Sequence, residues 1–147
     1  MSYSQFASKL VEFAKEEKSI EKVKLEIERI RTRTADPQEF LLTMGYAAHY
    51  ADNDDTQHVL SRICHAVGID RISSNAEEVY INADNCAIPR LKPHVIKMVK
   101  ESDGFDALVH DVMNAVRYSK TSHEQSLILR LVEGQTRDLA ASSTLDR

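Results

Sequence analysis

The first 33 positions of the chain repeat apolar residues at helical spacing. Phe6, Phe13, Ile20 and Ile27 lie seven residues apart, and most of the positions between them are polar. Because residues that are three, four and seven positions apart share one side of a helix, the pattern predicts an amphipathic helix over residues 3–33. Its apolar side, which we call the N-terminal stripe, consists of Phe6, Leu10, Phe13, Ile20, Val23, Ile27 and Ile30. Such a stripe requires an apolar surface to cover it.

An uninterrupted helix of this length does not fit easily into a small domain. Over residues 3–33 it would be about 46 Å long, whereas a compact chain of this size has a radius of gyration of about 15 Å. Ser19 is a suitable N-cap for a second helix, which predicts a break before Ile20. Lys9 and Glu16 interrupt the second row of apolar positions that a coiled coil needs. We therefore expect the stripe to pack into the domain core, with a homodimer through the stripe as the second option.

Capping signals mark where helices begin and end in the rest of the chain. Asp36, Pro37 and Glu39 combine an N-cap, a proline at the first helical position and a capping-box acid, so they predict a helix that begins at Pro37. Gly68 is typical of the residue just beyond a helix C-terminus, and Ile69 is its expected apolar contact.

Two further signals organise the middle of the chain. Ser74 and Glu77 form a capping box, and Pro89 and Pro93 bracket a predicted linker. The helices predicted beyond residue 36 cover residues 37–51, 56–67, 74–86, 95–101, 105–116 and 122–139. The sequence thus predicts an all-α fold, a single compact bundle of six to seven helices with a long or broken amphipathic N-terminal helix. This domain spans residues 1–141, and residues 142–147 form a C-terminal tail.

Composition favours a helical protein of the cytoplasm. The chain has 147 residues but only four glycines and three prolines, so it is long enough for one core and poor in turn residues. It contains no run of 18 apolar residues, and charged residues interrupt its first 20 positions, where a signal peptide needs an apolar core. Cys64 and Cys86 do not form a CxxC motif, which favours reduced thiols in a reducing compartment. We therefore expect a cytoplasmic protein with no membrane partner and no disulfide.

The net charge of −4 conceals an acidic middle segment. Residues 37–88 hold eight acidic residues against two arginines, which gives this segment a net charge of −6. Such a segment repels phosphate backbones and attracts basic surfaces. Nucleic acid is therefore not an expected partner, whereas a protein with a basic surface is.

One dipeptide resembles a known metal site. All-α metal phosphohydrolases of the HD type bind a divalent ion through a His-Asp pair, and His110-Asp111 is similar to that pair. The resemblance implies a hydrolytic site, because imidazole and carboxylate together suit a metal ion with open coordination positions. His65 or His94, together with Asp138, would complete the ligand set. A surface pair of residues at i,i+4 spacing on a helix is the alternative interpretation.

A second short segment, from Arg117 to His123, resembles the Arg and His spacing of HEPN-type ribonucleases, which are also small helical domains. The resemblance implies that the two side chains polarise the scissile phosphate and move protons during attack by the RNA 2′-hydroxyl. A polar loop between two helices is the alternative interpretation.

The common nucleotide-binding and hydrolase motifs are absent, since there is no glycine-rich phosphate loop, no GxSxG and no HExxH. We therefore expect a non-catalytic protein-binding module, such as a small intracellular adaptor or inhibitor, with no cofactor and no metal ion. The expected contact residues lie in the acidic segment and on the N-terminal stripe: Asp54, Asp55, Glu77, Glu78, Phe6, Phe13, Ile20 and Ile27. The HD-type hydrolase and the HEPN-like ribonuclease remain the enzyme alternatives.

Overall fold

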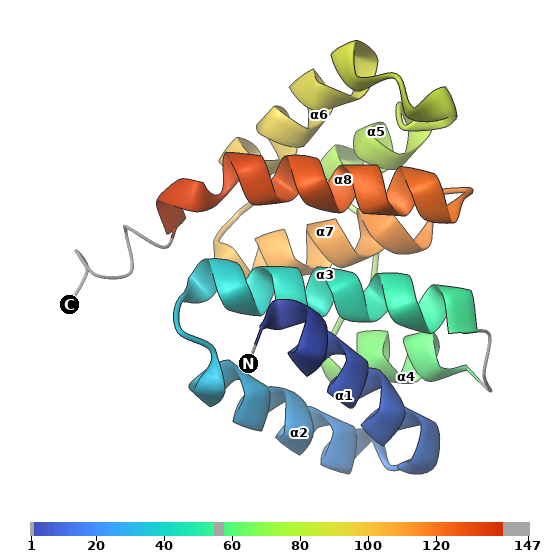
Figure 1. Ribbon diagram of the computed structural model, residues 1–147, viewed down its shortest axis with the longest axis vertical. Helices are drawn as coiled ribbons and strands as arrows, with labels where there is room; N and C mark the ends of the chain where they lie inside the picture. Colours follow the sequence, from blue (N-terminus) through green and yellow to red (C-terminus); the bar gives the residue numbers. More distant parts are fainter. Residues whose placement is uncertain (1, 55–57, 140–147) are drawn as a thin grey trace.

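The computed structural model describes residues 2–54 and 58–139, and within these ranges the regular structure is entirely helical (Figure 1). The elements are α1 (Tyr3–Glu16), α2 (Ile20–Arg33), α3 (Pro37–Asp54), α4 (Val59–Ala66), α5 (Ser74–Ile81), the 3-10 helix η1 (Asp84–Cys86), α6 (Ile88–Glu101), α7 (Phe105–Arg117) and α8 (Ser122–Gln135). The all-α prediction is confirmed, with eight α-helices and η1 in the described residues instead of six to seven helices. None of the described helices combines the length and the apolar character that a membrane crossing requires. The predicted tail, Asp55 and the predicted helix start at residue 56 lie outside the described residues.

Two helices, α1 and α2, divide the N-terminal stripe between them. The chain leaves helical geometry at Glu17, and Ser19 caps α2 by accepting a hydrogen bond from the Lys22 amide at 3.4 Å. α1 packs mainly against α3, and α2 packs mainly against α4. Five stripe residues are buried, while Phe13 and Ile20 are half-buried against the core. The chain's own helices thus cover most of the stripe.

The central helix of the bundle is α3, which contacts α1, α4, α7 and α8. Its start follows the predicted signals, because Asp36 Oδ1 accepts a hydrogen bond from the Glu39 amide at 2.9 Å. A Cβ atom at Gly45 would lie 2.5 Å from Leu129 Cδ2 of α8 and 3.2 Å from Val112 Cγ1 of α7. The missing side chain of Gly45 therefore sets how closely α3 approaches α7 and α8.

The C-terminal end of α3 extends beyond the predicted end before Asp52. Gln125 of α8 is almost fully buried, and its Nε2 donates a hydrogen bond to Asp52 Oδ2 at 2.7 Å. Its Oε1 accepts one from Asn53 Nδ2 at 2.8 Å and lies 2.7 Å from His49 Nδ1. These bonds to α8 hold the polar end of α3 in helical form, which local sequence signals do not reveal.

A Schellman motif ends α4 as predicted. Gly68 adopts a φ of 83°, in the left-handed region that glycine occupies without strain. Its amide donates to the His65 carbonyl and the Ile69 amide donates to the Cys64 carbonyl, both at 3.1 Å. The two bonds satisfy carbonyls that the helix end would otherwise leave without partners.

Several boundaries predicted further along the chain are wrong. The helix predicted over residues 74–86 ends at Ile81, and the short η1 follows it. Ser73, rather than Ser74, caps α5, because Ser73 Oγ accepts a hydrogen bond from the Ala76 amide at 3.1 Å. The segment from Pro89 to Pro93 is helical and belongs to α6 instead of forming a linker. Pro89 falls in the first turn, where backbone N–H groups have no partner within a helix, and Pro93 removes only one hydrogen bond of the next turn.

Aromatic side chains fix α1 on α3. The rings of Tyr3 and Tyr46 stack with their centroids 5.1 Å apart, and the Tyr46 and Tyr50 centroids are 5.9 Å apart. The hydroxyl of Ser4 lies 3.0 Å from that of Tyr50, and the Tyr3 hydroxyl donates to Glu133 Oε1 of α8 at 3.3 Å. This cluster joins the N-terminus of α1 to both α3 and α8.

Replacing Tyr46 with phenylalanine is expected to reduce the loss of stability at high pH. Burial, followed by the nearby Tyr3 and Glu133, raises the pKa of Tyr46 from 10.0 to about 12. The folded state therefore favours the neutral phenol. The stability that the neutral Tyr46 phenol contributes is complete below about pH 10 and is lost as the pH rises towards about 12. Urea unfolding of both proteins at about pH 8 and about pH 11 measures the difference. Equal losses of stability in the wild type and the Tyr46→Phe variant would contradict it.

Candidate interaction surfaces

Asp111, the acid of the His-Asp dipeptide, is buried in the bundle with only 7% of its surface exposed. Its Oδ1 accepts a hydrogen bond from Ser73 Oγ, the N-cap of α5, and its Oδ2 accepts one from Ser102 Oγ, which follows α6. Both bonds are 2.7 Å long. The two carboxylate oxygens thus link α7 to the start of α5 and the end of α6, and Asp111 stabilises the packing of these three helices.

The segment that joins α4 to α5 is held by two further side chains of α7. His110 Nε2 lies 2.9 Å from the Val67 carbonyl oxygen, and Asn114 Nδ2 donates to the Arg71 carbonyl at 3.2 Å. Together with the bond between Ser73 and Asp111, three polar residues of α7 contact one connecting segment. The side chains of the His-Asp dipeptide therefore face this segment.

These contacts do not fit the metal site of an HD-type hydrolase. Both oxygens of Asp111 are used by serine hydroxyls, and His94, one of the candidate ligands, lies 3.5 Å from Glu78 through its Nδ1. Among residues 2–54 and 58–139, no three His, Cys, Asp or Glu side chains gather as metal ligands would. The structure places His110, Asp111 and His94 in structural contacts, whereas His65 and Asp138 are exposed.

Arg117 and His123 contact different parts of the fold. The Arg117 guanidinium lies 4.6 Å from the ring centroid of Tyr118, and it opposes the rise that burial causes in the pKa of the Cys64 thiol of α4. His123 is exposed at the start of α8, where it lines a shallow hollow beside η1. Arg117 is not among the residues that line this hollow. Arg117 and His123 therefore do not line one common hollow that could hold a scissile phosphate, as the ribonuclease interpretation requires.

The acidic residues expected to contact a partner lie in two separate places. Asp54, at the end of α3, pairs with Lys15 of α1 at 2.6 Å, and this bond is the main cause of the raised pKa of Lys15. Glu78 of α5 lies 3.5 Å from both Lys97 and His94 of α6, while Glu77 is exposed. The described acids of the predicted contact set are therefore divided between the contact of α1 with α3 and the surface of α5.

Large apolar side chains are exposed beside Glu77. Ile81 is 50% exposed and shares one side of α5 with Glu77, because the two residues are four positions apart. The ring centroid of Tyr80 lies 5.6 Å from that of Tyr118, which is 41% exposed at the end of α7. Burial and the neighbouring Glu77 raise the pKa of Tyr80. We call Glu77, Glu78, Tyr80, Ile81 and Tyr118 the α5 patch.

The sequence indicated the acids of the α5 patch but not its apolar residues. Tyr80 and Ile81 look like ordinary core positions of an amphipathic helix, and Tyr118 comes from a distant part of the chain. Their proximity depends on how α5 packs against α7, which no local pattern encodes.

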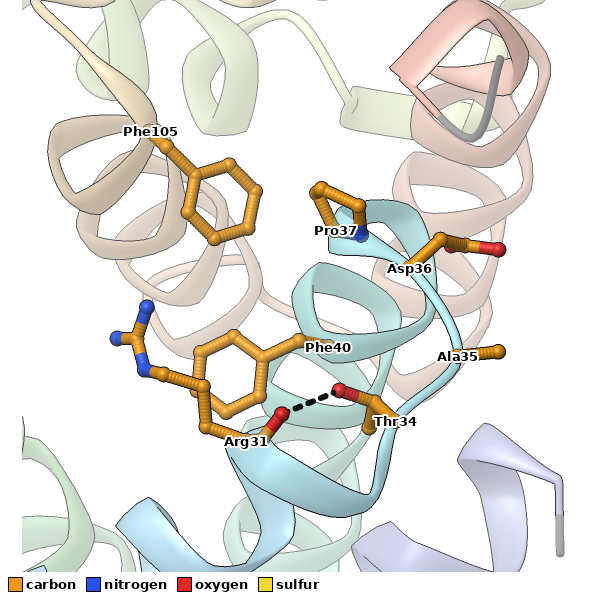
Figure 2. A pocket seen from close by; sticks show the side chains of 7 residues that line it. All are labelled: Arg31, Thr34, Ala35, Asp36, Pro37, Phe40 and Phe105. Atoms are coloured by element: carbon orange, nitrogen blue, oxygen red, sulfur yellow. Dashed lines mark hydrogen bonds between the residues drawn. The ribbon is translucent and has the colours of Figure 1, made fainter. Parts of the chain in front are cut away.

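An aromatic hollow lies where α2, α3 and α7 meet, as Figure 2 shows. Its volume is about 250 Å³, and its walls include Phe40, Phe105 and Pro37. The Arg31 guanidinium lies 4.3 Å from the Phe40 ring centroid, and the two phenylalanine centroids are 6.4 Å apart. The Asp36 carboxylate points away from the rings (Figure 2). Arg31 is thus the charged group that faces the aromatic walls.

A second hollow of about 190 Å³ adjoins the first, and Arg31 and Phe40 line both. Arg31 Nη2 reaches Asp106 Oδ1 at 3.2 Å, and the side chain of Asp106 is 73% exposed. Each hollow is smaller than the roughly 300–1,000 Å³ of a typical site for a small organic ligand. Spaces of this size suit single side chains of a binding partner.

A further hollow, of about 240 Å³, lies between α1 and α2. Phe6 and Leu10 of α1 and Ile30 of α2 are buried at its base, and Phe13 is half-buried beside them. Lys9, Glu26 and Arg33 line the same hollow. We call it the α1–α2 groove; two residues of the predicted contact set, Phe6 and Phe13, contribute to it.

Comparison of the chain with protein-family models, with curated proteins and with solved structures found no match. The surfaces of the described residues are therefore the basis on which a function can be proposed.

Proposed function

We propose that this chain is a non-catalytic protein-binding module, an adaptor or inhibitor, that holds a basic segment of a partner protein on the α5 patch. The observation that carries the proposal is the exposure of Ile81 and Tyr118 beside the exposed carboxylate of Glu77. Exposed apolar side chains bordered by charged groups are characteristic of surfaces that bind other proteins.

The chemistry of the α5 patch suits a partner with both apolar and basic side chains. Tyrosines supply large contact areas with few rotatable bonds, and they are enriched among the residues that dominate binding energies. The ion pairs of Glu78 with Lys97 and His94 are at least partly exposed, so exchanging them for a partner's cations costs little. Glu78 can therefore exchange Lys97 and His94 for cations of the partner when the patch binds it.

Long-range electrostatics also favour a basic partner. The segment 37–88 carries a net charge of −6, and such a field raises the rate at which basic partners approach. This contribution is screened by salt. Binding through the patch should accordingly weaken as ionic strength rises.

The proposal includes a cytoplasmic location and a single copy of the chain. Cys64 and Cys86 are both free thiols, which supports a reducing compartment. A homodimer through the N-terminal stripe is not part of the proposal, because five of its seven side chains are buried in the chain's own core.

Reversing the charge of the α5 patch is expected to weaken binding of a basic peptide at least about tenfold without unfolding the protein. The change is the double variant Glu77→Lys and Glu78→Lys. The probe is a labelled helical peptide of about 18 residues, with leucines along one side and lysines along the other. Fluorescence anisotropy gives the dissociation constant, and urea unfolding should show a loss of at most about 1 kcal/mol, as for exposed ion pairs.

The matched control is Glu16→Lys with Glu101→Lys, which makes the same change in net charge at exposed positions on other helices. This control should bind the peptide as the wild type does. Equal weakening in both double variants would mean that the peptide responds only to net charge, and it would overturn the assignment to α5. Absence of binding by the wild-type protein would overturn the proposal itself.

A further inference from the structure

The α1–α2 groove has the form of a site for a third helix. Phe6, Lys9, Leu10 and Phe13 are spaced three and four residues apart, so they share one side of α1. Glu26, Ile30 and Arg33 share one side of α2 in the same way. Two helices that face each other across a hollow present ridges and grooves into which side chains of another helix can pack.

The base of the α1–α2 groove is apolar and well supported. Phe6 is 7% exposed, Leu10 is fully buried and Ile30 is 4% exposed, and all three belong to the main hydrophobic core. Phe13 is half-buried against the same core, so part of its ring remains available to a ligand. Apolar side chains that enter the hollow would contact mainly Phe13, because Phe6, Leu10 and Ile30 expose little of their surface.

The rim of the groove carries positive charge that the chain itself does not neutralise. Lys9 and Arg33 are exposed, and neither has an ion-pair partner within the ranges that the structure describes. Glu26, the acid of the rim, already lies 3.6 Å from Arg29. Two cations therefore flank an apolar base.

From this arrangement we infer that the α1–α2 groove binds an acidic amphipathic helix of a partner protein. Apolar side chains of that helix fill the hollow, and its carboxylates pair with Lys9 and Arg33. Its hollow of about 240 Å³ suits anchor side chains better than a small organic ligand. This surface is distinct from the α5 patch and has the opposite preference for charge. In Figure 1, α1 and α2 lie at one end of the molecule and α5 and α6 at the other.

A tryptophan in the groove is expected to report the bound helix. The chain contains no tryptophan, so Phe13→Trp introduces a single fluorophore at a half-buried position of the groove. The probe is a tryptophan-free helical peptide of about 18 residues with leucines on one side and glutamates on the other. Its addition should shift the tryptophan emission to shorter wavelength, because the peptide excludes water from the ring. The matched reporter Tyr118→Trp in the α5 patch should not respond.

Charge reversal tests the role of the rim independently. With the same glutamate peptide, Lys9→Glu combined with Arg33→Glu should weaken binding at least about tenfold. Lys18→Glu combined with Lys92→Glu changes the net charge equally at exposed sites outside the groove, and it should leave binding unchanged. No response of the Phe13→Trp reporter, or equal weakening by the two double variants, would overturn the inference. Neither result depends on whether the basic peptide binds the α5 patch.

Discussion

Replacing Asp111 with alanine is expected to lower the free energy of unfolding by about 2–4 kcal/mol. The change removes two hydrogen bonds of 2.7 Å from the mostly buried Asp111. The Ser73 hydroxyl loses its carboxylate acceptor, whereas the Ser102 hydroxyl keeps the Met98 carbonyl at 2.7 Å. It also leaves a space where α7 meets the ends of α5 and α6. Urea unfolding followed by the helical circular dichroism signal measures the effect.

The Asp111→Asn variant is the matched control. Its amide keeps the size of the side chain and still offers one acceptor oxygen to a serine, so it should lose less stability than Asp111→Ala. If Asp111→Ala lost less than about 1 kcal/mol, the carboxylate would not be a main link between α7 and its neighbours.

Replacing Phe40 with alanine is expected to cost about 3–5 kcal/mol, more than the loss of the Asp111 carboxylate. Phe40 is 2% exposed, with the Arg31 guanidinium over its ring and the Phe105 ring beside it. Because Phe40 lines both hollows at the junction of α2, α3 and α7, its removal would also enlarge them. Urea unfolding again gives the change in stability.

The companion variant for this substitution is Arg31→Ala. It removes the cation above the ring but not the ring itself, and an exposed cation–π contact contributes only about 0.5–1 kcal/mol. A loss from Phe40→Ala as small as that from Arg31→Ala would show that the ring is not a main support of this junction.

Local signals predicted the parts of the fold that local chemistry decides. Asp36 and Pro37 start α3, and Gly68 ends α4, because a cap or a left-handed residue needs only its near neighbours. The Pro89 to Pro93 segment shows the limit of such signals. Prolines predicted a linker, yet the first turns of α6 tolerate them.

The candidate surfaces were only partly accessible from sequence. Glu77 and Glu78 could be selected because acidic residues concentrate in one segment, but Tyr118 joins them only through the packing of α7 on α5. The stripe was recognised from its spacing, whereas the groove depends on the angle between α1 and α2. In the sequence, Lys9 only argued against a coiled coil, and its place on the groove became visible in the structure.

The three contacts of α7 with the segment between α4 and α5 also affect how this protein unfolds locally. The segment lacks regular secondary structure, and such a connection would ordinarily fluctuate by itself. Here Val67, Arg71 and Ser73 are each bonded to a side chain of α7, a mostly buried helix. Releasing the segment therefore requires breaking its hydrogen bonds to α7, and we expect the segment and α7 to unfold as one cooperative unit.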